Sequence, residues 1–166
     1  MDENTKNLLK KYNQSEFLLV IKQAKKIIKK NPNNIILWNL IGGSYQALND
    51  LKNAKLWFSQ ALKNFPNNHE IFNNLGVICE NSNDEKKAFL NYEKALEIKP
   101  KYFDALYNIG SLFLRINRLE DAKGFLLEAL SLNPFSEKAL NNLGNVYFKL
   151  KEWKLAIECF EKNIKF

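Results

Sequence analysis

Asparagine recurs at a fixed interval along this chain, at Asn74, Asn108 and Asn142, each 34 residues after the last. An asparagine side chain carries both a hydrogen-bond donor and an acceptor, so it can pair with the main-chain amide of a peptide. A column of such side chains would hold an extended main chain with little regard for its side chains. The spacing therefore indicates a peptide-binding surface, provided that the three residues share one face of the fold.

A second interpretation of the same residues stays open. The chain is rich in asparagine throughout, so the column can also arise from compositional bias or from a structural preference at this position. Thirty-four residues before Asn74 the chain has Leu40 instead, which interrupts the column at that end.

Residues for catalysis show no comparable pattern. The single histidine, His69, has no partner that the spacing places near it, and its position suits the surface at the start of a helix. The sequence has no glycine-rich phosphate loop, metal-ligand cluster or nucleophile motif. Glu70, Glu80 and Asp104 are scattered at helix-surface spacing. We therefore expect a protein that is not an enzyme and that has no cofactor.

Three further columns keep the same interval and indicate the elements that position these side chains. The columns are Gly42, Gly76, Gly110 and Gly144; Pro32, Pro66, Pro100 and Pro134; and Ala54, Ala88, Ala122 and Ala156. Apolar residues recur between them at three- and four-residue steps, which predicts pairs of amphipathic helices. The predicted first helices span 34–48, 68–81, 102–116 and 136–149, and the second helices span 51–64, 84–98, 119–132 and 152–164. Residues 3–12 and 15–30 are predicted to form a divergent first pair.

The turn within each pair has its own signal. Asn49, Asn83 and Asn117 follow the first helices, and asparagine tolerates the left-handed conformation that favours a helix end. Lys151 occupies the same position in the last pair, and we expect that turn to be less favourable.

The glycine column predicts close helix contacts. A glycine inside a helix costs about 1 kcal/mol relative to alanine, so four in register require a packing reason. We expect Gly42 to face Ala54 and Gly110 to face Ala122, with the backbones of the two helices close together.

The period and its motif resemble those of the tetratricopeptide repeat. From residue 38 the motif reads Trp38-x2-Ile41-Gly42-x2-Tyr45, then Ala54-x3-Phe58, Ala61 and Pro66. The resemblance implies an all-α fold, a right-handed superhelical solenoid of antiparallel helix pairs. It divides the chain into a degenerate N-terminal capping repeat at 1–34, repeats at 35–68, 69–102 and 103–136, and a repeat at 137–166 that is truncated at its C-terminal end.

In this family the first helices line the concave side, so the resemblance also predicts binding residues. The peptide-binding candidates are Asn39, Asn73, Asn74, Tyr107, Asn108, Arg115, Lys138, Asn141, Asn142 and Asn145. Their asparagines are similar to the ladder of O-linked N-acetylglucosamine transferases, which grips acceptor polypeptides. The neighbouring charged and aromatic residues, which could steer an elongated partner, are Glu70, Glu80, Asp104, Phe148 and Lys149.

The carboxylate clamp of chaperone-binding family members is not expected. Only Asn108 and Lys138 match that pattern, while Asn73, Val77 and Asn142 occupy the remaining positions.

The formal net charge of +7 is concentrated near the N-terminus. Lys22, Lys25, Lys26, Lys29 and Lys30 are predicted to form the solvated face of the helix at 15–30. A nucleic acid or an anionic membrane is the alternative partner for such a run. Nucleic-acid binding would favour aromatic residues between the lysines, and the run has none. We therefore expect neither partner.

Cys79 and Cys159 fit no metal or redox spacing. The N-terminus lacks the order of a signal peptide, and no apolar run approaches the length of a membrane span. These features predict a cytoplasmic protein.

Two functions follow from this interpretation. The first is a scaffold that binds an extended peptide or a helix of a partner protein in the concave groove. The alternative is the N-terminal substrate-recruiting arm of a larger glycosyltransferase- or sulfotransferase-like enzyme. The last predicted helix keeps Trp153, Leu155, Ile157, Phe160 and Ile164 without a capping helix after it. Either this uncapped repeat self-associates, or the chain is the arm of something longer.

Overall fold

The computed structural model describes residues 1–164. The side chain of Ile164 and residues 165–166, which include Phe166 at the end of the predicted last repeat, lie outside the described residues.

The described chain consists of ten α-helices and contains no strand, which confirms the predicted all-α fold class. The helices are α1 (Glu3–Asn13), α2 (Phe17–Ile28), α3 (Ile35–Ala47), α4 (Leu51–Asn64), α5 (His69–Asn81), α6 (Glu85–Ile98), α7 (Phe103–Arg115), α8 (Leu119–Leu132), α9 (Glu137–Lys149) and α10 (Trp153–Ile164). Each begins and ends within two residues of its prediction.

Polar side chains and left-handed residues set the ends of these helices. Asp50 caps α4, because its carboxylate accepts a hydrogen bond from the backbone N–H of Asn53 at 3.1 Å. Asn68 caps α5, because its side-chain oxygen accepts from the backbone N–H of Ile71 at 2.9 Å. The predicted left-handed turns are confirmed, with φ of 58° at Asn49 and 65° at Lys151. Ser15, which was not predicted to do so, adopts the same conformation with φ of 61°.

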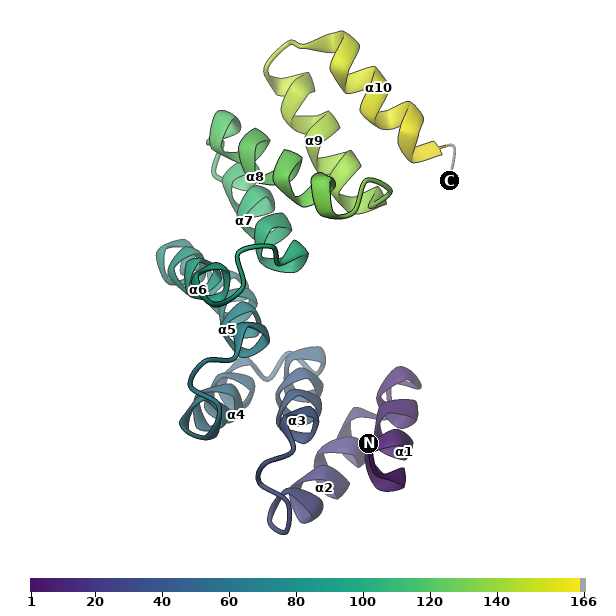
Figure 1. Cartoon of the computed structure of the whole chain (residues 1–166), viewed down its shortest axis with the longest axis vertical. Coiled ribbons are helices and arrows are strands. Elements are labelled where there is room, and N and C mark those ends of the chain that lie inside the picture. The colour runs from purple at the N-terminus through teal and green to yellow at the C-terminus, as the bar shows by residue number, and fades with distance from the viewer. Residues whose placement is uncertain (165–166) are drawn as a thin grey trace. The chain divides into compact units, whose positions relative to one another are not determined.

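The helices form two compact units, divided between Asp84 and Glu85. In the N-terminal unit each of α1 to α4 packs on the helix that follows it, and α3 also contacts α1 and α5 (Figure 1). In the C-terminal unit each of α6 to α9 packs on the helix that follows it, and α7 also contacts α9. Within each unit, consecutive helices are therefore neighbours, and so are the first helices of successive pairs, as expected for stacked helix pairs.

The glycine column marks close contacts, and the atoms nearest to Gly42 and Gly110 belong to residues other than the predicted alanines. A Cβ atom at Gly42 would lie 2.6 Å from the ring of Phe58, and one at Gly110 would lie 2.7 Å from Cγ of Leu126. Phe58 and Leu126 each follow the predicted alanine by one helical turn. Side chains of a helix lean toward its N-terminus, so these large side chains reach back over the glycines.

The lysine-rich α2 differs from the prediction at one residue. Lys22, Lys26, Lys29 and Lys30 are exposed, whereas Lys25 is half-buried. Its Nζ donates to the Tyr45 hydroxyl oxygen at 2.6 Å and lies 5.1 Å from the ring centroid of Trp57. Lys25 therefore connects α2 to α3 and α4 through a hydrogen bond and a cation–π contact, and the solvated face contains only the other four lysines.

Cys79 and Cys159 are free and buried, and burial raises the pKa of the Cys159 thiol. No helix among residues 1–164 has the length and apolar character needed to cross a bilayer.

Candidate peptide-binding surface

The predicted binding residues lie on two surfaces, one in each unit. The α3–α5 face is defined by Asn39 of α3 and by Asn73 and Asn74 of α5. The α7–α9 face is defined by Tyr107, Asn108 and Arg115 of α7 and by Lys138, Asn141, Asn142 and Asn145 of α9. The two helices of each face are in contact, so the candidates of each unit lie on neighbouring helices.

On the α3–α5 face the asparagines are largely engaged or covered. The amide nitrogen of Asn39 donates to the Glu70 carboxylate at 3.0 Å. Its carbonyl oxygen is buried and accepts from no donor among the described residues. Asn73 is only 6% exposed and Asn74 is half-buried. This face therefore offers few amide groups to a partner.

On the α7–α9 face Lys138 is the centre of a mixed polar and aromatic cluster. Its Nζ lies 3.8 Å from a carboxylate oxygen of Asp104 and 4.4 Å from the ring centroid of Tyr107. Phe103 adds a second ring, 5.3 Å from the same ammonium group. Both charged side chains are about half exposed, so this ion pair contributes little to stability. The contacts hold Lys138 in place and leave the cluster open to solvent.

Asn142 extends this cluster along α9. Its amide nitrogen donates to the Tyr107 hydroxyl at 3.5 Å, near the upper limit for a hydrogen bond. Such a weak bond orients the Asn142 side chain. Little free energy is lost when a bond to a partner replaces it. Asn108 of α7 is half-buried.

Two asparagines on this face are free. Asn141 and Asn145 are exposed, and neither forms a hydrogen bond within the described chain. They are four residues apart on α9, so they share one side of the helix. Phe148 and Lys149 continue that side and are also exposed. The face thus presents two available amides between a lysine cluster and an exposed aromatic ring.

Arg115 lies away from the cluster. It forms an ion pair with Glu85 of α6 at 3.1 Å. It is also eight residues beyond Tyr107, which corresponds to about 12 Å along the helix. The structure therefore does not bring Arg115 and Lys138 into one group.

Phe103 also belongs to this face, although it is not among the predicted binding candidates. Its ring stacks on Tyr107 with centroids 6.2 Å apart and an interplanar angle of 6°. The signal was available, because residues four apart on a helix are neighbours.

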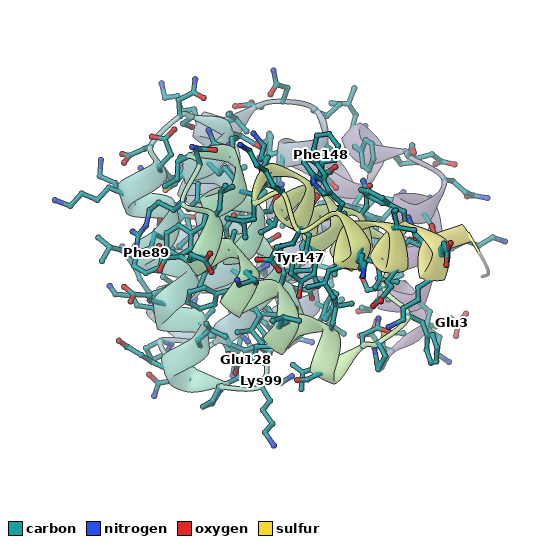
Figure 2. All side chains as sticks on the ribbon, turned by 90° about the horizontal axis from the view of Figure 1, so that it is seen from above. Glu3, Phe89, Lys99, Glu128, Tyr147 and Phe148 are labelled. Atoms are coloured by element: carbon teal, nitrogen blue, oxygen red, sulfur yellow. The ribbon has the colours of Figure 1, made fainter. Side chains whose placement is uncertain are left out.

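A separate cleft of about 250 Å³ lies between α8, α9 and α10. It is lined mainly by apolar side chains, among them Leu127, Leu140, Tyr147 and Leu155. In Figure 2, Tyr147 and the exposed Phe148 are labelled on either side of the α10 ribbon. The cleft is smaller than a usual ligand pocket. No group of three or more His, Cys, Asp or Glu side chains gathers as a metal site within residues 1–164.

Comparison with protein-family models places the chain among known repeats. Models described as tetratricopeptide repeat match residues 35–68 and 69–102, residues 91–124, and residues 137–166. Together these matches cover most of the chain. A search of curated proteins found no significant match.

Several solved structures share the fold. Pseudomonas aeruginosa PilF has a TM-score of 0.89 at 16% identity, with 99% of this chain and 75% of that chain covered. MamA has a TM-score of 0.79 at 21% identity, with 99% and 94% covered. YrrB, described as a TPR protein with an unusual peptide-binding site, has a TM-score of 0.69 at 19% identity, with 98% and 84% covered. At these identities the similarity shows the fold, and the binding residues and the link to transferases stay predictions.

Proposed function

We propose that this chain, which belongs to the tetratricopeptide repeat family, is a protein-interaction scaffold without catalytic activity of its own. Its α7–α9 face would hold an extended peptide or a helix of a partner protein. The observation that carries the proposal is the pair of exposed, unengaged amides at Asn141 and Asn145 beside the Lys138 cluster.

The chemistry of the face favours a polypeptide main chain. An amide can donate to a carbonyl oxygen and accept from an N–H of the same backbone. Exposed Phe148 offers apolar contact next to these amides. The solved YrrB structure, described as having a peptide-binding site, supports a peptide as the partner on this fold.

The test is selection of binders from a random peptide display library on the immobilised chain. Affinities of the selected peptides are then measured for the unsubstituted chain and for the Asn141→Ala/Asn145→Ala variant. Each hydrogen bond contributes about 1 kcal/mol, so we expect roughly 30-fold weaker binding when both are lost.

A matched control removes two exposed asparagines elsewhere, as Asn7→Ala/Asn64→Ala. This control should bind as tightly as the unsubstituted chain. Equal affinity of the Asn141→Ala/Asn145→Ala variant and the unsubstituted chain would reject the α7–α9 face as the binding surface.

We also propose that this chain binds a second copy of itself. The observation behind this is that α10 exposes apolar side chains outside the α7–α9 face. Self-association through α10 is a separate part of the proposal and does not require the amides of Asn141 and Asn145. Sedimentation velocity across a concentration series tests it, with a monomer at every concentration as the contradicting result.

A further inference from the structure

An apolar patch lies where α9 ends and α10 begins. It consists of Phe148, Trp153 and Ile157, which are 58%, 51% and 56% exposed. The rings of Phe148 and Trp153 meet edge to face with centroids 5.2 Å apart, so the patch is continuous. Exposed apolar patches of this kind mark interaction sites, and tryptophan is enriched among the residues that dominate binding energy.

The preceding repeat shows what normally covers these positions. Thirty-four residues before Trp153 and Ile157 are Leu119 and Lys123 of α8, and both are half-buried. Their helix packs on α9, the helix that follows it. The equivalent positions of α10 therefore have the geometry to pack against another helix.

The charged residues of α10 suit a second copy of α10 as the helix that packs on the apolar patch. Trp153 and Ile157 are four residues apart, the spacing of two successive core positions of a heptad repeat, whereas the Phe160 ring packs over Gly144 of α9. Lys154 and Glu161 are exposed and occupy the same flanking position, seven residues apart. When two copies of such a helix pack antiparallel, equivalent flanking positions face each other, so each Lys154 lies opposite the partner subunit's Glu161.

The helix α1 does not offer a comparable surface. The exposed side chains of α1 include Asn4, Asn7 and Lys10, and a head-to-tail contact of α10 with this surface would desolvate them without apolar burial. A two-fold contact buries the same patch from both copies.

We propose that two copies of this chain pair through α10, packed antiparallel about a two-fold axis near Ile157. The inference rests on the proposed self-association and specifies its surface and direction. Phe148, Trp153 and Ile157 of each copy form the apolar centre. Two symmetry-related Lys154–Glu161 pairs flank it and select the antiparallel direction.

The surface is tested by sedimentation velocity on the full chain and on Ile157→Glu, with Leu56→Glu as the matched control. Leu56 of α4 is 50% exposed and lies outside the patch. We expect a monomer–dimer equilibrium for the chain and the control, and a monomer for Ile157→Glu with unchanged helical circular dichroism. A monomeric unsubstituted chain would overturn self-association itself, and a dimeric Ile157→Glu variant would overturn this surface.

The direction is tested by charge reversal. Lys154→Glu places like charges opposite each other in both symmetry-related pairs, and we expect the dimer to dissociate on the order of tenfold more readily. The double variant Lys154→Glu/Glu161→Lys restores opposite charges and should recover the original equilibrium. If Lys154→Glu has no effect while Ile157→Glu is monomeric, the surface stands and the antiparallel arrangement is wrong.

Discussion

The α3–α5 face and the α7–α9 face carry asparagines in the same repeating pattern. They differ in how many of the asparagine amides are available to a partner. On the α3–α5 face Asn39 donates to Glu70 at 3.0 Å and Asn73 is buried. On the α7–α9 face Asn141 and Asn145 are exposed and form no hydrogen bond with another described residue. A side chain that already forms an internal hydrogen bond gains little by exchanging it for a bond to a partner. Availability, rather than asparagine content, therefore distinguishes the α7–α9 face.

The faces also differ in charge. Glu70 is the group that engages Asn39 on the α3–α5 face, whereas Lys138 and the exposed Lys149 flank the free amides of the α7–α9 face. Lys138 is already close to Asp104, so Lys149 is the charge more available to a partner. A bound peptide with an acidic side chain near Lys149 would associate faster at low salt.

The largest predicted effect concerns the packing that both faces share. Leucine in place of Gly110 would clash with Leu126, and leucine in place of Gly42 would clash with Phe58. We expect each variant to lose about 1–3 kcal/mol of unfolding free energy, as measured by urea unfolding. Gly124 is the control, because a Cβ atom there meets nothing within 4 Å. Unchanged stability of Gly110→Leu would mean that the described helix contact is wrong.

The comparison between the faces is tested directly by single substitutions. Asn145→Ala removes an available amide and is expected to weaken a selected peptide about fivefold, equivalent to roughly 1 kcal/mol. Asn39→Ala removes an engaged amide and should leave the peptide affinity unchanged. Fluorescence polarisation with a labelled peptide provides both values. A larger loss for Asn39→Ala than for Asn145→Ala would reverse the assignment of the two faces.

A smaller effect is expected at the turns before α4 and α10. Asn49 and Lys151 both have a left-handed backbone, which costs an ordinary residue roughly 1–2 kcal/mol and asparagine less. Lys151→Asn should therefore raise the stability by about 0.5–1 kcal/mol. Thermal unfolding measures the gain, with Lys55→Asn, at an exposed helical position of α4, as the control. A decrease in melting temperature would show that Lys151 stabilises the turn in another way.

The smallest predicted effect is the pH dependence that the Asp50 cap of α4 gives to the free energy of unfolding. Hydrogen bonds from the Asn53 side chain and backbone hold the pKa of the Asp50 carboxyl below its usual 3.8. A lowered folded-state pKa contributes stability that is present above the unfolded value and is lost as the pH falls through the folded value. The corresponding residue before α8, Arg118, has no side-chain cap bond.

Urea midpoints at neutral pH and below pH 3.8 measure this contribution. The fall between the two conditions should be smaller for Asp50→Asn than for the unsubstituted chain. An equal fall in both proteins would show that the Asp50 cap contributes no pH dependence.

Most of the fold was predictable because the interval of 34 residues repeats local signals. Proline and asparagine mark helix ends through their backbone preferences, which explains the close agreement at α4 and α8. The glycine partners were less predictable. A period shows which helices approach each other, but it does not show that Phe58 rather than Ala54 reaches over Gly42.

The candidate surface was predictable only in outline. The period placed Asn39 and Asn145 on first helices, yet their availability depends on neighbours from other helices, such as Glu70 beside Asn39. Lys25 shows the same limit. It belongs to a run of lysines in the sequence, and its engagement with Tyr45 depends on how α2 packs on α3.

Peptide binding by the α7–α9 face is tested most directly by nuclear magnetic resonance of the asparagine side-chain amides. A peptide selected from the display library is added stepwise to the isotopically labelled chain. If the α7–α9 face binds the peptide, the amide signals of Asn141 and Asn145 shift most, while that of Asn39 stays in place. Shifts confined to the α3–α5 face, with Asn141 and Asn145 unchanged, would contradict binding by the α7–α9 face.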